Sequence, residues 1–148
     1  MRSARDVERL HALLTEYEER LPADPRHGSV PDLAAVERRY GDPNAAFLAI
    51  GEGVAAGCVA VTRFDASRAR LRHLFVTPAF RGHGLARRLT EAAIAFAAES
   101  GYGVLALDTE KTRLAAAYRL YVSLGFEECA PYGPVDYETP TFMQLRLR

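Results

Sequence analysis

The sequence predicts a mixed α/β fold in which a three-stranded antiparallel meander leads into a strand–helix–strand unit. Between residues 45 and 76, three apolar stretches are separated by short turns, and such short connections favour antiparallel neighbours. A helical pattern at 84–100 precedes an apolar strand at 103–108, which is typical of a parallel strand pair joined by a helical crossover. The predicted order is two helices, three strands, a helix, a strand, a helix and a final strand.

The composition is that of an ordinary globular protein. We expect one domain spanning residues 1–148, because this length suffices to bury a core. The formal net charge is zero, so neither nucleic acid nor a membrane is an expected partner. Residues 1–20 are charged and lack a signal-peptide core, which predicts a cytoplasmic protein. The 4 histidines and 2 cysteines show no metal-ligand spacing, and we expect no metal site and two reduced thiols.

Two helices are expected near the N-terminus. Residues 4–21 have the pattern of an amphipathic helix, because apolar side chains recur at steps of three and four from Val7 to Leu21. Pro22 ends this helix. The segment 22–44 is rich in Pro, Gly and Asp, with a short helix expected at 32–40. Such a long irregular segment in a compact domain is often functional.

The remaining elements follow from turn residues and periodicity. The meander strands are predicted at 45–50, 56–63 and 70–76, with Gly57 marking an expected bulge. The helix at 84–100 is expected to end at Gly101, and the helix at 114–124 at Gly125. A short strand is expected near Glu127. Alternating apolar and polar residues predict a last strand at 141–147.

A glycine turn between the third strand and the following helix is the strongest functional signal. Pro78 ends the strand, and Gly82 and Gly84 follow it with one residue between them. The start of the next helix directs unpaired N–H groups and the positive end of its dipole into this turn. Because glycines let a ligand approach the backbone closely, the turn predicts an anion site, most simply for phosphate.

The turn matches neither common nucleotide-binding pattern. No Gly-Lys-Ser/Thr follows it, and Arg87 stands where the dinucleotide fingerprint has its third glycine. It does match Arg-x-x-Gly-x-Ala at Arg81 to Ala86, and Leu-Tyr-x-x-x-Gly-Phe follows at 120–126. With this pair of motifs, the sequence from about residue 45 to 126 closely resembles the GNAT superfamily of N-acetyltransferases. The resemblance implies a mostly antiparallel, splayed sheet with helices on both faces, and a first strand that is missing or reduced to residues 1–4.

The resemblance also implies a site for acetyl-CoA. The backbone of the third strand should pair with the pantetheine arm, and the N–H groups from Gly82 to Arg87 should hold the pyrophosphate. Arg87 and Arg88 either add positive charge near the phosphates or lie on a solvated helix face. The expected cofactor-binding residues are Leu74, Phe75, Val76, Arg81, Gly82, His83, Gly84, Leu85, Ala86 and Arg87.

Tyr121 matches the family's usual general acid. A phenol with a pKa of about 10 stays protonated at neutral pH and can donate a proton to the departing thiolate. The alternative is a tyrosine that packs on the apolar face of its helix. Tyr118, one turn earlier, is the second candidate for the acid.

Two positions depart from the family pattern. Leu114 replaces an asparagine that often binds the cofactor, and Arg70 replaces a glutamate that often acts through water as the base. Arg70 and Arg72 point to the same face of their strand, so that face either favours an acceptor with a carboxylate or phosphate or is simply solvated. His73 is expected to alternate to the opposite face. The candidates for the base are His73, Asp108, Glu110, Asp136 and Glu138.

The expected function is direct transfer of an acetyl group from acetyl-CoA to a primary amine of a small molecule. Two alternatives stay open: a peptide or protein amine acetyltransferase, and a non-catalytic acyl-CoA-binding module. The acceptor is expected between the segments 22–44 and 131–140, because loops rich in Pro, Gly, Asp and Tyr often face substrates. The oligomeric state is open, with a homodimer as one alternative.

Overall fold

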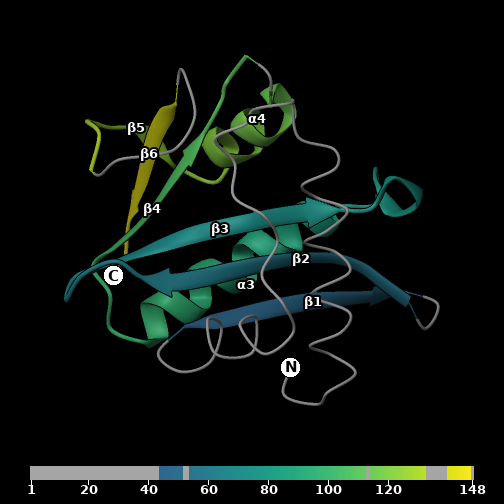
Figure 1. Cartoon of the computed structure of the whole chain (residues 1–148), viewed down its shortest axis with the longest axis horizontal. Coiled ribbons are helices and arrows are strands. Elements are labelled where there is room, and N and C mark those ends of the chain that lie inside the picture. Colours follow the sequence, from purple (N-terminus) through teal and green to yellow (C-terminus); the bar gives the residue numbers. More distant parts are fainter. Residues whose placement is uncertain (1–43, 52–53, 113, 133–139, 148) are drawn as a thin grey trace, which may run out of the picture.

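The computed structural model describes residues 44–51, 54–112, 114–132 and 140–147. The predicted helices at 4–21 and 32–40 and the reduced strand at 1–4 lie outside these ranges. The described elements alternate as predicted (Figure 1). They are β1 (Ala45–Gly51), β2 (Val54–Arg63), β3 (Arg68–Val76), the 3-10 turn η1 (Pro78–Phe80), α3 (Leu85–Glu99), β4 (Val104–Thr109), α4 (Ala115–Ser123), β5 (Glu127–Glu128) and β6 (Thr141–Arg146).

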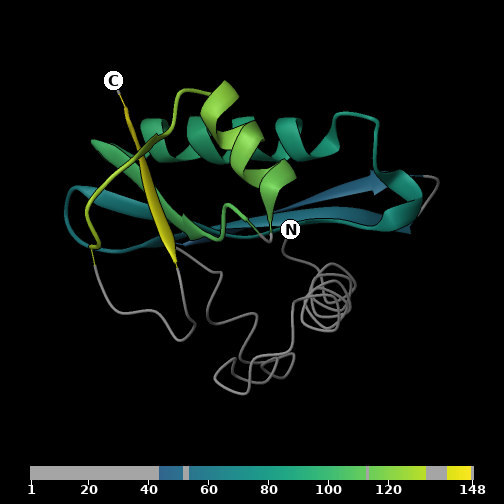
Figure 2. The same ribbon diagram turned by 90° about the horizontal axis from the view of Figure 1, so that it is seen from above.

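The described strands form one sheet in the order β1-β2-β3-β4-β6-β5. β1, β2 and β3 make the predicted antiparallel meander, and β3 and β4 are parallel, joined through α3. The expected mixed fold is therefore confirmed. Both described helices, α3 and α4, lie on the same side of the sheet (Figure 2). Among the described residues, no helix has the length and apolar character that a membrane crossing requires.

The parallel pair of strands separates soon after it forms. β3 pairs with β4 only from Arg68, opposite Val104, to Arg70, opposite Ala106, and the two strands then diverge (Figure 1). β4 instead pairs with β6 along its whole length. This divergence, which we call the fork, is the splay that the family resemblance predicted.

The two faces of the sheet differ in character. The core lies between the sheet and α3, and among its members are Leu71, Leu105, Leu107 and Met143. On the opposite face, strand alternation places Arg70 in line with Ala106 and Gln144 of the neighbouring strands. The fork therefore has an apolar side beneath the helices and a polar side away from them.

A bulge in β3 interrupts the regular alternation. Ala60 of β2 is opposite Arg72, whereas Cys58 is opposite Phe75, so β3 holds one extra residue between these pairs. His73 lies in this bulge with φ at 56°, a left-handed conformation that is uncommon outside glycine. Leu71, Leu74 and Val76 all contact the core as a result, because the extra residue shifts the alternation of the strand beyond the bulge. That His73 faces the side opposite Arg70 and Arg72 stays a prediction.

Gly57 allows α3 and β3 to approach β2 closely. A Cβ at this position would lie 2.8 Å from the carbonyl oxygen of Phe75 and 3.0 Å from Cδ1 of Leu89. The register between β1 and β2 also shifts beside it, where Ala49 is opposite Gly57 and Ile50 is opposite Ala55. The predicted irregularity at Gly57 is confirmed, and close packing explains the need for glycine.

Substitution Gly57→Ala should therefore destabilise the fold. The backbone oxygen of Phe75 cannot move away as a flexible side chain would, so we expect the free energy of unfolding to fall by about 1–3 kcal/mol in urea denaturation. Gly103→Ala is the matched control, because its Cβ would meet the Ser67 oxygen at an ordinary 3.8 Å. Equal stabilities of the two variants would contradict the packing argument.

Candidate active site

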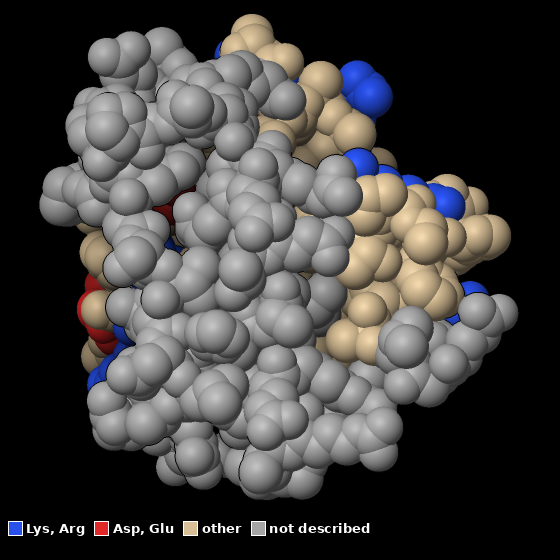
Figure 3. Space-filling view, turned by 45° about the vertical axis from the view of Figure 1, so that its right-hand side comes forward, with Lys and Arg blue, Asp and Glu red and all other residues tan. Residues whose placement is uncertain are grey.

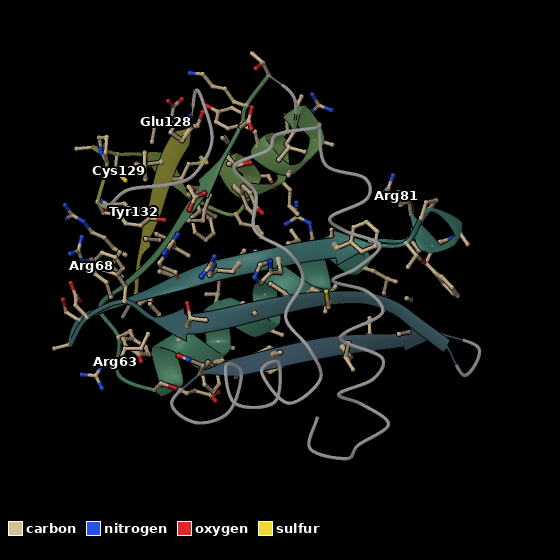
Figure 4. The ribbon with its side chains drawn as sticks, viewed as in Figure 1. Arg63, Arg68, Arg81, Glu128, Cys129 and Tyr132 are labelled. Atoms are coloured by element: carbon tan, nitrogen blue, oxygen red, sulfur yellow. The ribbon has the colours of Figure 1, made fainter. Side chains whose placement is uncertain are left out.

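The turn after β3 is anchored to the sheet by Arg81. Its Nε donates to the Val76 carbonyl oxygen at 3.0 Å, and its guanidinium lies 5.8 Å from the centroid of the Phe75 ring. The Thr77 N–H donates to the Ala56 oxygen at 2.8 Å. Figure 4 shows Arg81 at the end of β3, where the turn begins. The side chain of Arg81 thus fixes the turn against the end of β3.

The turn itself presents an exposed, glycine-lined backbone. Gly82 and Gly84 have φ of 82° and 78°, and a Cβ on either would meet nothing within 4 Å. Gly84 is the N-cap of α3 and has no side chain with which to cap it. Within the described residues, the N–H groups from Gly82 to Arg87 donate no hydrogen bond to a protein acceptor. These groups and the dipole of α3 can hold an anion.

The charges around the turn are positive. Arg81, Arg87 and Arg88 are all exposed. In the space-filling view, the described surface on the side of the turn carries blue side chains and no red ones (Figure 3). Such a surface attracts an anionic ligand.

Arg87 also links the turn to α4. Its Nη2 donates to Oγ of Ser123 at 2.7 Å, and that hydroxyl donates to the Leu120 carbonyl oxygen at 2.7 Å. The side chain of Arg87 is therefore directed at the end of α4, which also carries Tyr121.

The two candidate acids lie in different surroundings. Tyr121 is 5% exposed and belongs to the core, with its ring 5.6 Å from that of Phe126. Tyr118 donates its Oη to Glu128 at 2.7 Å on the surface, and this hydrogen bond raises the pKa of Tyr118. Packing in the core explains the position of the Tyr121 ring. The hydroxyl of a buried tyrosine is still a polar group that can donate a hydrogen bond.

The open edge of β3 contains the bulge. Beyond Arg70, the residues Leu74, Phe75 and Val76 follow on a strand that has no β4 partner among the described residues. On the other side, Cys58 is fully buried and its Sγ donates to the His73 carbonyl oxygen at 3.3 Å. Burial raises the pKa of the Cys58 thiol to about 12, so it stays a donor and supports the strained residue.

The two thiols should differ in reactivity. With a pKa of about 12, Cys58 is thiolate in only about one molecule in 10⁴ at pH 8, so a disulfide reagent should label Cys129 alone in the native protein and both residues in guanidinium. The unfolded thiol ionises near its ordinary value of 9.0, so stability is lost as pH rises from 9 towards 12. A native Cys129→Ser variant that reacts at once would contradict this assignment.

Arg70 is paired with a carboxylate across the fork. Its Nη2 lies 3.0 Å from Oδ1 of Asp108, and the side chains are 20% and 17% exposed. Tyr132 donates its Oη to the same oxygen at 3.2 Å. The simple expectation of a cationic face is therefore wrong at Arg70, because Asp108 compensates its charge.

The other candidate bases are not brought together there. Glu110 is buried just beyond β4, and His73 occupies the bulge. Asp136 and Glu138 lie outside the described residues. Among the described residues, no group of three or more His, Cys, Asp or Glu side chains is placed to hold a metal ion.

Comparison with known proteins assigns the chain to a family. Residues 8–126 match the model of the acetyltransferase (GNAT) family. The chain is a member of the GNAT family. It is therefore a GNAT acyltransferase, and the resemblance inferred from the two motifs is confirmed.

Similar sequences and solved structures agree with the assignment of this chain to the GNAT family. An uncharacterized N-acetyltransferase of Schizosaccharomyces pombe is 33% identical over 146 residues, which cover 96% of this chain and 89% of the relative. The N-acetylaspartate synthetase of Danio rerio is 36% identical over 112 residues, 74% of this chain and 39% of that protein. An acetyltransferase of Salmonella typhimurium, solved with acetyl-CoA, has a TM-score of 0.80 at 24% identity, covering 99% of this chain and 91% of its own.

Sequence reasoning missed three contributors to the site of this GNAT enzyme. Cys58 supports the bulge, and Tyr132 and Phe64 flank Arg70. The role of Cys58 follows from the register of β2 against β3. Tyr132 and Phe64 come close to Arg70 only in the folded chain. Phe64 directly follows β2, which ends at Arg63, next to residues that indicated a turn and nothing more.

Proposed function

We propose that the chain transfers an acetyl group from acetyl-CoA directly to the primary amine of a small molecule. The observation that carries this proposal is the combination of an open β3 edge with an uncapped helix start at its end. The two features provide donors for an extended arm and for a diphosphate on one continuous stretch of backbone. Family membership and the related structure solved with acetyl-CoA support the choice of donor.

Each part of this backbone has a role in the proposal. The backbone groups of the stretch from Leu74 to Val76 that point away from β2 pair with an amide-containing arm, as an added strand would. The N–H groups from Gly82 to Arg87 hold the pyrophosphate. Arg81 positions the turn, and the bulge at His73 reorients the backbone where the acetyl group would lie.

Tyr121 acts as the general acid in this proposal. As the neutral amine attacks the thioester carbonyl carbon and the carbon–sulfur bond breaks, the phenol donates its proton to the sulfur. The nitrogen loses one proton to water, and the phenolate takes one back from water, so that the products are the amide and the CoA thiol. The rate enhancement would come mainly from positioning, with backbone N–H groups polarising the carbonyl oxygen. Tyr118 is less suited, because its hydroxyl is engaged with Glu128.

A small acceptor that carries a carboxylate fits best. The Danio rerio relative is named for N-acetylaspartate, an acetylated amine with carboxylates. Arg72 shares the polar face of β3 with Arg70. Although Asp108 compensates the charge of Arg70, the guanidinium N–H groups on this face can bind a carboxylate of the acceptor.

Release of CoA measured over a panel of amines tests this function. The panel contains free amino acids, polyamines and peptides with free N-termini, and we expect turnover with small amines. Preferred turnover of peptides would favour the peptide acetyltransferase, and acetyl-CoA binding without any turnover would leave only a binding module. Initial rates should intersect in double-reciprocal plots, whereas parallel lines would indicate an acyl-enzyme in place of direct transfer.

A further inference from the structure

Arg70 and Asp108 form a charge pair on the polar side of the fork. Arg70 is the last residue of β3 that pairs with β4, and Asp108 lies two residues beyond its partner Ala106, on the same face. The two charged groups are 3.0 Å apart. The pair therefore bridges the strands at the point where they begin to diverge.

An aromatic frame holds this pair in place. The guanidinium of Arg70 lies 5.4 Å from the centroid of the Tyr132 ring and 6.0 Å from that of Phe64. Tyr132 packs edge-on against Phe64 at 5.3 Å and against Phe142 at 4.9 Å. Figure 4 shows Tyr132 on the side of the sheet formed by β4 and β6. Stacked and hydrogen-bonded side chains of this kind are pre-organised to bind.

The positive charge of Arg70 persists in this setting. Burial alone would lower the pKa of Arg70, but Tyr132 and Asp108 outweigh it and raise the pKa, so Arg70 remains a cation. The pKa of Tyr132 is raised above its ordinary value, mainly by burial, so its hydroxyl remains a donor to Asp108. A guanidinium has five N–H donors, and within the described residues the Nε of Arg70 is buried without a hydrogen-bond partner.

We propose that Arg70 and Asp108 together recognise the acceptor as a zwitterion, the free α-amino acid. Asp108 binds the ammonium group and Arg70 binds the carboxylate, beside the fork where the acetyl group is delivered. The bound ammonium group loses one proton to water before its nitrogen attacks the thioester. This inference rests on the proposed function and names its substrate class.

Charge complementarity favours free α-amino acids over simple amines, simple anions and peptides. A simple amine or polyamine is attracted by Asp108 and repelled by Arg70 at nearly the same distance, and an anion without an amine meets the opposite combination. Only a ligand with both charges a few ångströms apart gains from both groups. A peptide N-terminus has the ammonium group but lacks the adjacent carboxylate.

The test compares amino acids with their amides. The values of kcat/KM are measured for L-alanine against L-alaninamide and for L-aspartate against the same acid with its α-carboxylate amidated. We expect the free acids to be preferred about tenfold or more, the range of one charge-assisted contact. Arg70→Gln should abolish this preference, and Arg70→Lys should retain part of it. Asp108→Asn should raise KM for acids and amides alike.

Arg68→Gln is the matched control. Arg68 lies on the same face two residues earlier, but its Nη2 pairs with Asp65 at 2.7 Å, away from the fork. This variant should keep the preference of the unaltered protein. Thermal melts and the Kd for acetyl-CoA are measured for every variant, so that a loss of activity caused by unfolding is recognised. If Arg70→Gln does not fold, the preference retained by Arg70→Lys tests the role of Arg70.

The outcomes separate this inference from the proposed function. If no amine at all is acetylated while acetyl-CoA binds, the proposed function fails. If amines are acetylated but amides equal their acids, or if folded Arg70→Gln keeps the preference, the zwitterion assignment is overturned and the acetyltransferase stands.

Discussion

Replacing Tyr121 with phenylalanine should lower kcat by about 10²-fold or more while the Kd for acetyl-CoA stays unchanged. The variant removes only the hydroxyl, and the ring keeps its contacts with Phe126 and the core. The loss therefore reports on proton donation to the departing sulfur. Steady-state kinetics and calorimetry of acetyl-CoA binding measure the two quantities.

Tyr118→Phe provides the matched control for this experiment. It removes a hydroxyl one helical turn earlier, where the partner is Glu128 on the surface. We expect kcat to change little. If Tyr118→Phe loses activity and Tyr121→Phe stays active, Tyr118 is the general acid. If kcat is unchanged in both variants, neither of these tyrosines of α4 is the general acid.

Substitution Gly84→Glu should eliminate measurable binding of acetyl-CoA. Gly84 has φ of 78° at the start of α3, so any side chain strains the turn. A carboxylate there also occupies the positive end of the helix dipole and repels phosphates. Isothermal titration calorimetry measures the affinity, and Gly84→Ala separates strain from charge, with an intermediate loss expected.

Gly101→Glu is the corresponding control at the other end of the same helix. Gly101 is also exposed and left-handed, with φ of 89° and open space around its Cβ position. This variant carries the same charge and similar strain but lies far along α3 from the turn, so binding should persist. If Gly84→Glu bound acetyl-CoA as tightly as Gly101→Glu, the phosphate site would not be at the turn.

Local chemistry made much of this architecture predictable. Turn residues separated the meander strands, and Gly101 and Gly125 marked the ends of α3 and α4, where both have positive φ. The structure begins β3 at Arg68, two residues earlier than expected, because Arg68 pairs with Val104. Strand ends depend on partners, which periodicity does not contain.

The polar side of the site was less accessible to sequence reasoning. Arg70 and Asp108 are 38 residues apart along the chain, and their contact depends on the register of two parallel strands. The bulge at His73 likewise depends on how β2 and β3 align. The departure at Arg70 was visible in the sequence, but its compensation by Asp108 required the fold.

The fork has a consequence for the behaviour of the protein in the absence of its substrates. Beyond Arg70, β3 presents to β4 a strand edge that has no ladder partner among the described residues, and such edges pair readily with other extended chains. A bound donor that lies along β3 would cover this edge and join the β1–β3 half of the sheet to the β4–β6 half. Acetyl-CoA would then stabilise the folded state and protect the protein from self-association. The melting temperature would rise with the concentration of acetyl-CoA.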